Sequence, residues 1–401
     1  MVNLFQRNLF QRNIILFYII GSLMWARFYI PVLALFYVAS QVPIEQFAVI
    51  MGVFSLTILL FEVPSGVVAD IIGKKKTLMI ARFAYVIELF LVAFFNGFWI
   101  FFIAKIISGF AVSLSSGADD ALLYDTLKKL KIEHKHKEIY GKFHMIMNVS
   151  MAVFFIAGSI LFTINPKLPA IISIPFAFVG FILTFLLEEP FQSNKQLSIK
   201  SSMLHFKEGW TYFKNHKYVK YLVLYSFPVY LIIHALMSMS SAYLKEIQIP
   251  ISVIGLIAFI SSMIIAYASK KANQIEEYLG EAKTLRAIQV LAGVGVFFCA
   301  LMIPFAGAAL YMFIPFVSGF FVVIINHYMN AHIESSHRAT MLSIKNMFDN
   351  LAFFLFFPII GYLIKFKSMQ FSFLSLGIFF VVWVFLLHLY ARNKNFKEVC
   401  K

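Results

Sequence analysis

The stretch GVVADIIGKKKTL, from Gly66 to Leu78, decides how the chain folds. It lies between two long apolar runs, with Asp70 where the first run ends, Gly73 at the turn and three lysines directly after it. We interpret it as a short elbow between two membrane helices: the small Gly66 permits close packing, the acid caps the next helix and Gly73 makes the turn. Because lysine and arginine gather in cytoplasmic loops, the basic cluster predicts that the elbow lies on the cytoplasmic side.

The composition is that of an integral membrane protein. Of the 401 residues, 61% are hydrophobic and only 13% are charged, against about 25% charged residues in a soluble domain. In a soluble protein, the net charge of +15 would suggest nucleic acid. Here basic residues at helix ends contact anionic membrane lipid, so we expect membrane lipid as a partner and no nucleic acid.

Twelve apolar runs approach the length of about 20 residues that a membrane-spanning helix needs. They cover residues 14–38, 46–69, 77–95, 98–122, 143–164, 169–187, 219–241, 250–269, 286–304, 308–329, 340–364 and 370–391. With the N-terminus in the cytoplasm, almost all lysines and arginines outside the spans are cytoplasmic. The sequence therefore predicts an all-α integral membrane protein with 12 transmembrane helices and both termini in the cytoplasm.

The longest polar interruption falls near the middle of the chain and divides six spans from six. It predicts an N-terminal six-helix bundle (1–187), a cytoplasmic linker (188–218) and a C-terminal six-helix bundle with a cytoplasmic tail (219–401). The two halves also repeat short motifs, since GKKKTL from Gly73 returns as GEAKTL from Gly280. Two pseudo-symmetric bundles are typical of an alternating-access transporter with its substrate site between them.

The elbow matches a known signature, G-x-[LV]-x-D-x-x-G-[RK]-[RK]-x-x-[LI], at every fixed position. Those positions are Gly66, Val68, Asp70, Gly73, Lys74, Lys75 and Leu78. In this motif and in its topology the chain resembles the major facilitator superfamily. The phrases EVPSG from Glu62 and SGADDALLYD from Ser116 are similar to a bacterial branch whose members are regarded as exporters. The resemblance implies a secondary transporter of the bacterial inner membrane, with no enzymatic activity and no cofactor.

Two further family motifs are altered in this chain. The proton-coupled antiporters of the family that the chain resembles carry an arginine in the fourth span. In this chain Lys105 occupies that position, followed by Ser108 and Gly109. The antiporter motif G-x-x-x-G-P of the fifth span is missing, since that span has Gly158 but no proline. Its loss weakens the prediction of a standard drug–proton antiporter.

Two cations lie inside predicted spans, where an ionisable group costs about 2.5–3.5 kcal/mol and is a functional candidate. Counting about 1.5 Å per residue places Arg27 and Lys105 at a similar level of the membrane. Two cations at one level repel unless something negative lies between them, and three explanations stay open. A protein acid lies there, with Glu62 or Asp349 nearest by depth; an anionic group of the substrate does; or both side chains reach outward to polar surroundings.

Glu62, ahead of Pro64, and Asp349 in the eleventh span are the candidates for carrying the coupling proton. Glu88 is at mid-depth in the third span, which packs peripherally in this fold, so we expect a structural role for it. His234 in the seventh span and Asn326 in the tenth are further candidates for the cavity wall, although a hydrogen-bonded core histidine is the more ordinary explanation for His234.

Three acids at the end of the fourth span are predicted to pair with loop cations and to act in gating. The gating set comprises Gly66, Asp70, Gly73, Lys74, Lys75, Asp119, Asp120 and Asp125. No pattern indicates a metal site or covalent catalysis, and the loop pair His134 and His136 is interpreted as solvated.

The sequence predicts secondary active transport of a small organic solute by a monomer, with protons as coupling ion and efflux as first choice. Proton-coupled uptake of an anionic metabolite is the alternative within transport, and a membrane receptor is the alternative outside it. The substrate, the direction and the coupling ratio are not encoded in any motif.

Overall fold

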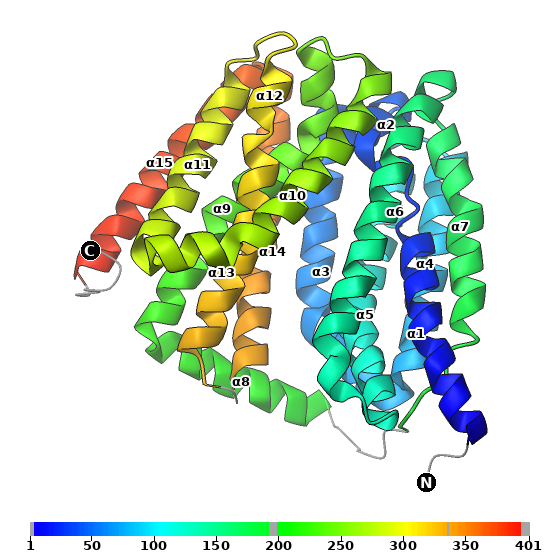
Figure 1. Cartoon of the computed structure of the whole chain (residues 1–401). Helices are drawn as coiled ribbons and strands as arrows, with labels where there is room; N and C mark the ends of the chain where they lie inside the picture. Colours follow the sequence, from blue (N-terminus) through cyan, green and yellow to red (C-terminus); the bar gives the residue numbers. More distant parts are fainter. Residues whose placement is uncertain (1–3, 192–198, 335–336, 394–401) are drawn as a thin grey trace. The chain divides into compact units, whose positions relative to one another are not determined.

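The computed structural model describes residues 4–191, 199–334 and 337–393, and these are mainly helical (Figure 1). In chain order the helices are α1 (Leu4–Met24), α2 (Leu33–Ala39), α3 (Ile44–Ile72), α4 (Lys74–Phe94), α5 (Phe98–Lys129), α6 (His136–Ile164), α7 (Leu168–Thr184), α8 (Ile199–Asn215), α9 (Lys217–Glu246), α10 (Ile251–Leu279), α11 (Glu281–Ala300), α12 (Gly307–Tyr311), α13 (Phe313–His332), α14 (Arg338–Phe366) and α15 (Met369–Asn393), with short 3-10 turns at Ile30–Val32 and Glu133–Lys135.

Within the described residues, ten helical segments are long and apolar enough to cross a membrane. The shorter apolar helix α7 is the predicted sixth span, and the predicted first span is divided between α1 and α2. The predicted tenth span begins in α12 and continues as α13. The all-α architecture with 12 membrane segments is therefore confirmed, and the linker contributes the additional helix α8.

The first span is broken at Trp25–Tyr29, between α1 and the turn that leads into α2 (Figure 1). Two neighbouring helices shape this break. The backbone N–H of Phe28 donates to Ser173 Oγ of α7 at 3.1 Å, which satisfies a donor that the helix no longer uses. On α6, a Cβ at Gly158 would stand 1.8 Å from the Phe28 carbonyl oxygen. Only glycine fits there without moving the broken backbone.

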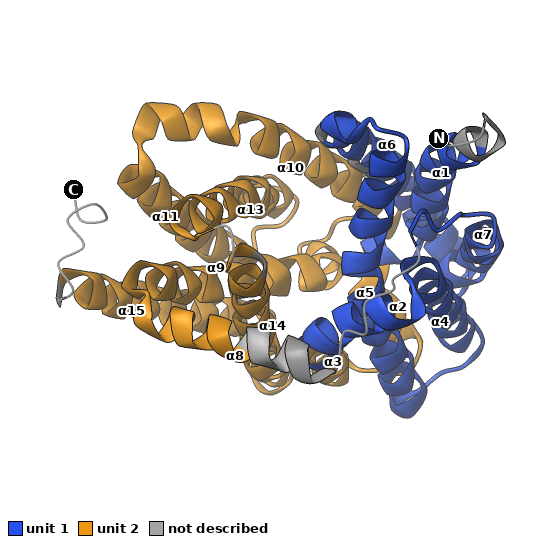
Figure 2. Cartoon of the chain, turned by 90° about the horizontal axis from the view of Figure 1, so that it is seen from below, with its two compact units in different colours: residues 1–31, 57–202 blue, residues 32–56, 203–401 orange. Residues whose placement is uncertain are grey.

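The chain divides into two compact units, coloured separately in Figure 2. Unit 1 comprises residues 1–31 and 57–202, and unit 2 comprises residues 32–56 and 203–401. In unit 2, Ser241 Oγ of α9 accepts from the N–H groups of Ala34 and Leu35 at 3.1 and 3.4 Å, so it caps α2. Glu45 of α3 pairs with Lys365 of α14 at 2.7 Å. The far ends of the first two spans thus pack with α9 and α14.

In unit 1, α4 and α5 form an antiparallel pair joined by a short turn at Asn96 and Gly97. Buried alanines on both helices, Ala81 and Ala104 among them, have no exposed surface, and small residues of this kind let membrane helices approach closely. This pairing sets the middle of α4 against the middle of α5.

Candidate functional site

A carboxylate and an ammonium group meet where α4 and α5 pack in unit 1. Glu88 Oε1 accepts from Lys105 Nζ at 2.9 Å and from the Tyr29 hydroxyl at 2.9 Å. The Glu88 side chain has no exposed surface, and Lys105 and Tyr29 are nearly as buried. The second oxygen, Oε2, accepts no hydrogen bond within the described part of the chain. An ion pair this dry is stable only because each charge has the other close by.

Arg27 supplies a second cation from the break in the first span. Its guanidinium lies over the Tyr85 ring, 4.2 Å from the centroid, and the side chain is only half-buried. Lys105 Nζ lies 5.8 Å from the centroid of the Tyr29 ring. With Glu88 ionised, the group of Arg27, Lys105 and Glu88 carries one net positive charge. We call these three residues, with Tyr29 and Tyr85, the Glu88 cluster.

The acid that pairs with Lys105 is Glu88, so the expectation of Glu62 or Asp349 at this position was wrong. Those two acids were suggested by their depth along the membrane normal alone. Depth gives no information on the rotation of a helix about its own axis. Glu62 is half-buried on α3, where its carbonyl accepts from Ser65 Oγ at 3.0 Å. The proposal that Lys105 reaches outward is also wrong, because its ammonium is held inside the cluster.

The sequence contained a usable signal for Glu88. This residue stands eight positions before Asn96, and Lys105 stands eight positions after Gly97. In an antiparallel helix pair, residues equally far from the turn lie at the same level. A count from the turn would therefore have matched the two charges.

Asp349 belongs to a second buried pair, in unit 2. Its Oδ2 lies 3.0 Å from Lys345 Nζ, one turn earlier on α14, and its Oδ1 accepts from Ser226 Oγ of α9 at 2.7 Å. The spacing of four residues between Lys345 and Asp349 is that of a helical ion pair. His234 of α9 is exposed and stacks on the Tyr230 ring at 3.9 Å between centroids.

The elbow that links α3 to α4 turns at Gly73, whose φ of 93° lies in the left-handed region that favours glycine. The Glu189 carboxylate fills the space beside it and accepts from the Lys74 backbone N–H at 2.6 Å. The Lys74 ammonium pairs with Asp125 of α5. An acid thus sits at the N-terminus of α4, as predicted, but it is Glu189 and not Asp70.

The other predicted gating residues lie close to this elbow. Asp119 pairs with the buried Arg82 of α4 at 2.7 Å, and Asp120 lies 3.1 Å from the His136 ring. Asp70 has no hydrogen bond or ion pair within the described residues. Apart from its own helix backbone and chain neighbours, no atom of the described residues lies within 4 Å of a Cβ built on Gly66, so the predicted close packing is not seen there.

Unit 2 has a matching elbow at Gly280, also with positive φ, between α10 and α11. There Glu281 lies 3.3 Å from the His332 ring of α13 and accepts from the Tyr218 hydroxyl. Glu281 stands 207 positions after Lys74, and His332 stands 207 positions after Asp125. The elbow contact is therefore repeated at the same spacing, with a glutamate in place of the lysine and a histidine in place of the aspartate. Asn326, also on α13, is half-buried.

No group of three or more His, Cys, Asp or Glu side chains that could hold a metal ion occurs among residues 4–191, 199–334 and 337–393. The buried charged groups of the described chain lie in single ion pairs with hydroxyl groups beside them. Such groups can hold a proton or a polar solute.

Comparison with known proteins identifies the family. The family model described as Major Facilitator Superfamily matches residues 15–335, which is most of the chain. The protein therefore belongs to the major facilitator superfamily, whose members are membrane transporters and not enzymes. It is accordingly a multi-pass membrane protein of the transmembrane transport class.

Solved structures show the same fold. The chain is similar to a crystal structure of a mutant of the nucleoside transporter NupG, with a TM-score of 0.82 and 13% identity over 95% of this chain and 99% of that one. A D-xylose-proton symporter matches with a TM-score of 0.71 and 13% identity over 94% and 97% of the two chains. A bacterial homologue of the human lysosomal transporter Spinster has a TM-score of 0.74, with 13% identity over 96% and 97%.

A search of curated proteins gives no significant match. At 13% identity the structural likeness establishes the fold alone, and the site residues of the similar proteins cannot be transferred to this chain.

Proposed function

We propose that the protein is a proton-coupled symporter of a small organic anion, with the Glu88 cluster as the site at which anion and proton meet. The observation that carries the proposal is the charge of the cluster. Lys105 pairs with the one buried carboxylate, and the half-buried Arg27 lies over the Tyr85 ring, so one positive charge of the cluster is left for a substrate.

The coupling follows from charge balance. When Glu88 takes up a proton, Lys105 loses its counter-charge and the cluster carries two positive charges. A monoanionic substrate beside Arg27 and Lys105 returns the cluster to its former charge. Each ligand therefore favours the binding of the other, and by reciprocity the two are transported together. The guanidinium of Arg27 offers a planar fork for a carboxylate or a phosphate, and Lys105 offers a point charge.

Proton-driven efflux, the first choice from the sequence, is less well supported. In a proton exchanger, substrate and proton compete for the same site. A substrate that competes with a proton for the Glu88 carboxylate would be a cation. The surplus positive charge of the cluster repels cations. The name of one similar structure, a D-xylose-proton symporter, also favours symport.

The remaining expectations belong to the same proposal. We infer a monomer in the bacterial inner membrane with both termini in the cytoplasm, and two halves (1–187 and 219–401, joined by 188–218) that rock about the substrate site. His234, Asn326, Glu62 and Asp349 stay candidates for the cavity wall and for secondary proton sites. The elbow residues of the gating set are proposed to latch the cytoplasmic end.

The test is a thermal-shift screen of the purified protein at about pH 5.5 and about pH 8, because protonation of Glu88 should promote anion binding. The panel contains monocarboxylates, dicarboxylates, sugar phosphates, nucleosides and lipophilic cations. We expect at least one anion to raise Tm, and to raise it more at the lower pH.

Two variants make the screen specific. Arg27→Gln should abolish the shift, whereas Lys76→Gln, which removes an exposed cation at the start of α4, should leave it intact. Stabilisation by lipophilic cations alone, or a full shift in Arg27→Gln, would contradict the proposal. Stabilisation by nucleosides independent of pH would point to a neutral polar substrate.

A further inference from the structure

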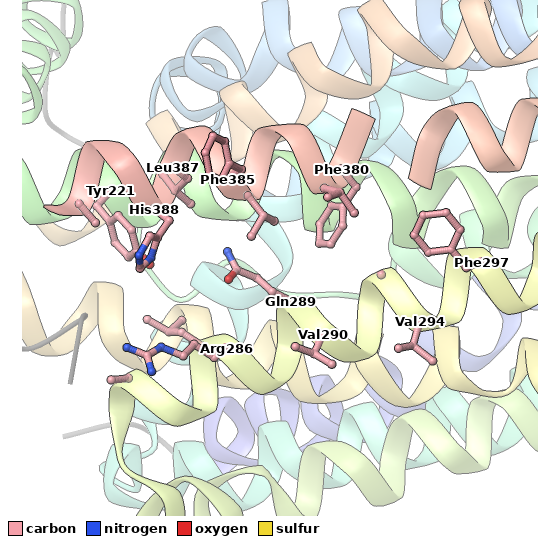
Figure 3. A pocket seen from close by; sticks show the side chains of 16 residues that line it. Tyr221, Arg286, Gln289, Val290, Val294, Phe297, Phe380, Phe385, Leu387 and His388 are labelled. Atoms are coloured by element: carbon pink, nitrogen blue, oxygen red, sulfur yellow. The ribbon is translucent and has the colours of Figure 1, made fainter. Parts of the chain in front are cut away.

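A groove of about 690 Å³ runs between α11 and α15 of unit 2 (Figure 3). Its two ends differ in chemistry. Arg286 and Gln289 of α11 and His388 of α15 lie toward one end, and Phe297 and Phe380 lie toward the other (Figure 3). The volume is within the range of about 300–1,000 Å³ that is usual for ligand pockets.

The length of the groove corresponds to one leaflet of a bilayer. From Arg286 to Phe297 the helix rises about 16 Å, at about 1.5 Å per residue. The hydrocarbon core of a membrane is about 30 Å thick, so one leaflet contributes about half of that. The polar end lies near the first turns of α11 and the last turns of α15. The ends of a helix long enough to span the core are expected at the membrane surface. An amphiphile lying in the groove would thus have its polar group at the surface and its chain in the core.

The polar end has the chemistry of a phosphate site. Arg286 is an exposed guanidinium, and guanidinium forks bind phosphate oxygens in a bidentate way. Gln289 and His388 add donors beside it, and the same helix ends carry the exposed cations Lys283 and Arg392. The acid at the start of α11, Glu281, is engaged by His332 and Tyr218. An anionic headgroup would meet positive charge here.

The apolar walls have the chemistry of an acyl-chain site. Val290 of α11 is 62% exposed, and Gly293 on the same face leaves the groove open beside the Phe380 ring. A Cβ on Gly293 would reach that ring at 3.4 Å, so a larger side chain would narrow the groove. The wall is therefore apolar and leaves space beside Gly293.

We propose that this groove binds an anionic membrane phospholipid, with its phosphate at Arg286, Gln289 and His388 and one acyl chain along Val290, Gly293 and Phe380. The site lies in unit 2, whereas the Glu88 cluster lies in unit 1, so the lipid site is independent of the proposed transport chemistry. A second copy of the chain and free phosphate are the competing occupants, and the experiment separates them.

The experiment is native mass spectrometry of the detergent-solubilised protein titrated with dioleoylphosphatidylglycerol or with dioleoylphosphatidylcholine. We expect a saturable first adduct with the phosphatidylglycerol and about tenfold weaker binding of the phosphatidylcholine, since the headgroup charge pairs with Arg286. Arg286→Gln should remove this preference, while Lys270→Gln, which removes an exposed cation of α10 outside the groove lining, should keep it. Equal binding of the two lipids, or equal loss in both variants, would overturn the proposal.

A second pair of variants tests the acyl-chain wall. Val290→Trp places a large side chain in the groove from its exposed edge, and Val322→Trp places one on an exposed position of α13 outside it. Only Val290→Trp should lower phosphatidylglycerol binding, by about tenfold, because it takes the space of the chain. Displacement of the lipid by millimolar inorganic phosphate would show an ion site instead. A dimer that Val290→Trp dissociates would show an interface between copies, and either result would overturn the lipid assignment.

Discussion

Each unit buries an acid beside a lysine, but the two arrangements differ in origin and in charge. In unit 1, Glu88 of α4 meets Lys105 of α5, and Arg27 from the broken first span adds an unmatched cation. In unit 2, Asp349 meets Lys345 one turn away on the same helix, and their charges cancel. An ion pair within one helix stabilises that helix. A cluster of charges assembled from three segments changes its contacts when those segments move.

The backbone shows the same contrast. The first span is unwound at Trp25–Tyr29, while α9, its counterpart in the second half, is a continuous helix from Lys217 to Glu246. Broken membrane helices are tolerated where they line a site or are buried in protein. This difference supports the proposal that solute and proton bind in unit 1.

The largest effect should come from neutralising the two acids in turn. Glu88→Gln should lower proton-driven uptake about 100-fold or more, because breaking a buried pair costs about 3–5 kcal/mol and removes the proton site. Asp349→Asn also breaks a buried pair, but that pair is not the proposed proton site and the hydrogen bond from Ser226 can remain, so it should lower uptake only about threefold. The measurement is uptake into proteoliposomes under an imposed pH gradient, once the thermal-shift screen has named a substrate.

Misfolding of Glu88→Gln would obscure that result, so a double variant serves as its control. Glu88→Gln with Lys105→Gln leaves no unpaired buried charge at this pair and should restore the Tm while transport stays lost. If Asp349→Asn proved the more damaging of the two single changes, the contrast between the units would be reversed.

The next effect concerns the break in the first span. Gly158→Ala puts a methyl group where the Phe28 carbonyl oxygen lies, 1.8 Å away, and should displace Arg27. Overpacking of this kind costs about 1–3 kcal/mol, and we expect about tenfold weaker anion binding in a titration by thermal shift. Gly141→Ala on the same helix, with no atom within 4 Å, is the matched control and should bind normally. Unchanged anion binding in both variants would show that Arg27 does not contribute to the anion site.

A smaller effect should follow from removing the hydroxyl that supports the break. Ser173→Ala leaves the Phe28 N–H without its acceptor, which costs about 1–3 kcal/mol for a buried donor and should lower the Tm. Ser262→Ala in unit 2 removes a hydroxyl that, among the described residues, donates to the carbonyl of Ala258 on its own helix, at 3.0 Å. Its Tm should change little, and an equal loss in both variants would argue against a special role for the break.

The smallest effect should come from the two elbows. The Lys74–Asp125 and Glu281–His332 pairs are both partly exposed, and such pairs contribute about 0–1 kcal/mol. Asp125→Asn and His332→Gln should therefore each change the transport rate by about threefold or less while substrate affinity stays unchanged. A large loss of affinity in Asp125→Asn would mean that the elbow binds substrate and is not a latch.

Much of the fold could be predicted because hydropathy, loop charge and the Gly66–Leu78 signature each report on position along the membrane normal. The same counting placed Arg27 and Lys105 near one level. Hydropathy carries no information on rotation, however, so the partner of Lys105 was assigned to Glu62 or Asp349 when it is Glu88.

The break in the first span could not be predicted either. Residues 14–38 form one apolar run, and the helix ends inside it because Ser173 and the bare Gly158 accommodate an unwound Phe28. Those two residues lie more than a hundred positions away from Phe28. From the sequence, Gly158 was considered only as part of an antiporter motif whose proline is missing. Tertiary packing, not local propensity, decides this element.

The central claim is that anion and proton bind together at the Glu88 cluster. The most direct measurement is the change in pH of a weakly buffered protein solution when the stabilising anion from the screen is added. We expect uptake of about one proton per anion bound, and none in Glu88→Gln, because binding of each ligand favours the other. Release of a proton on binding, or equal uptake in Glu88→Gln, would contradict it.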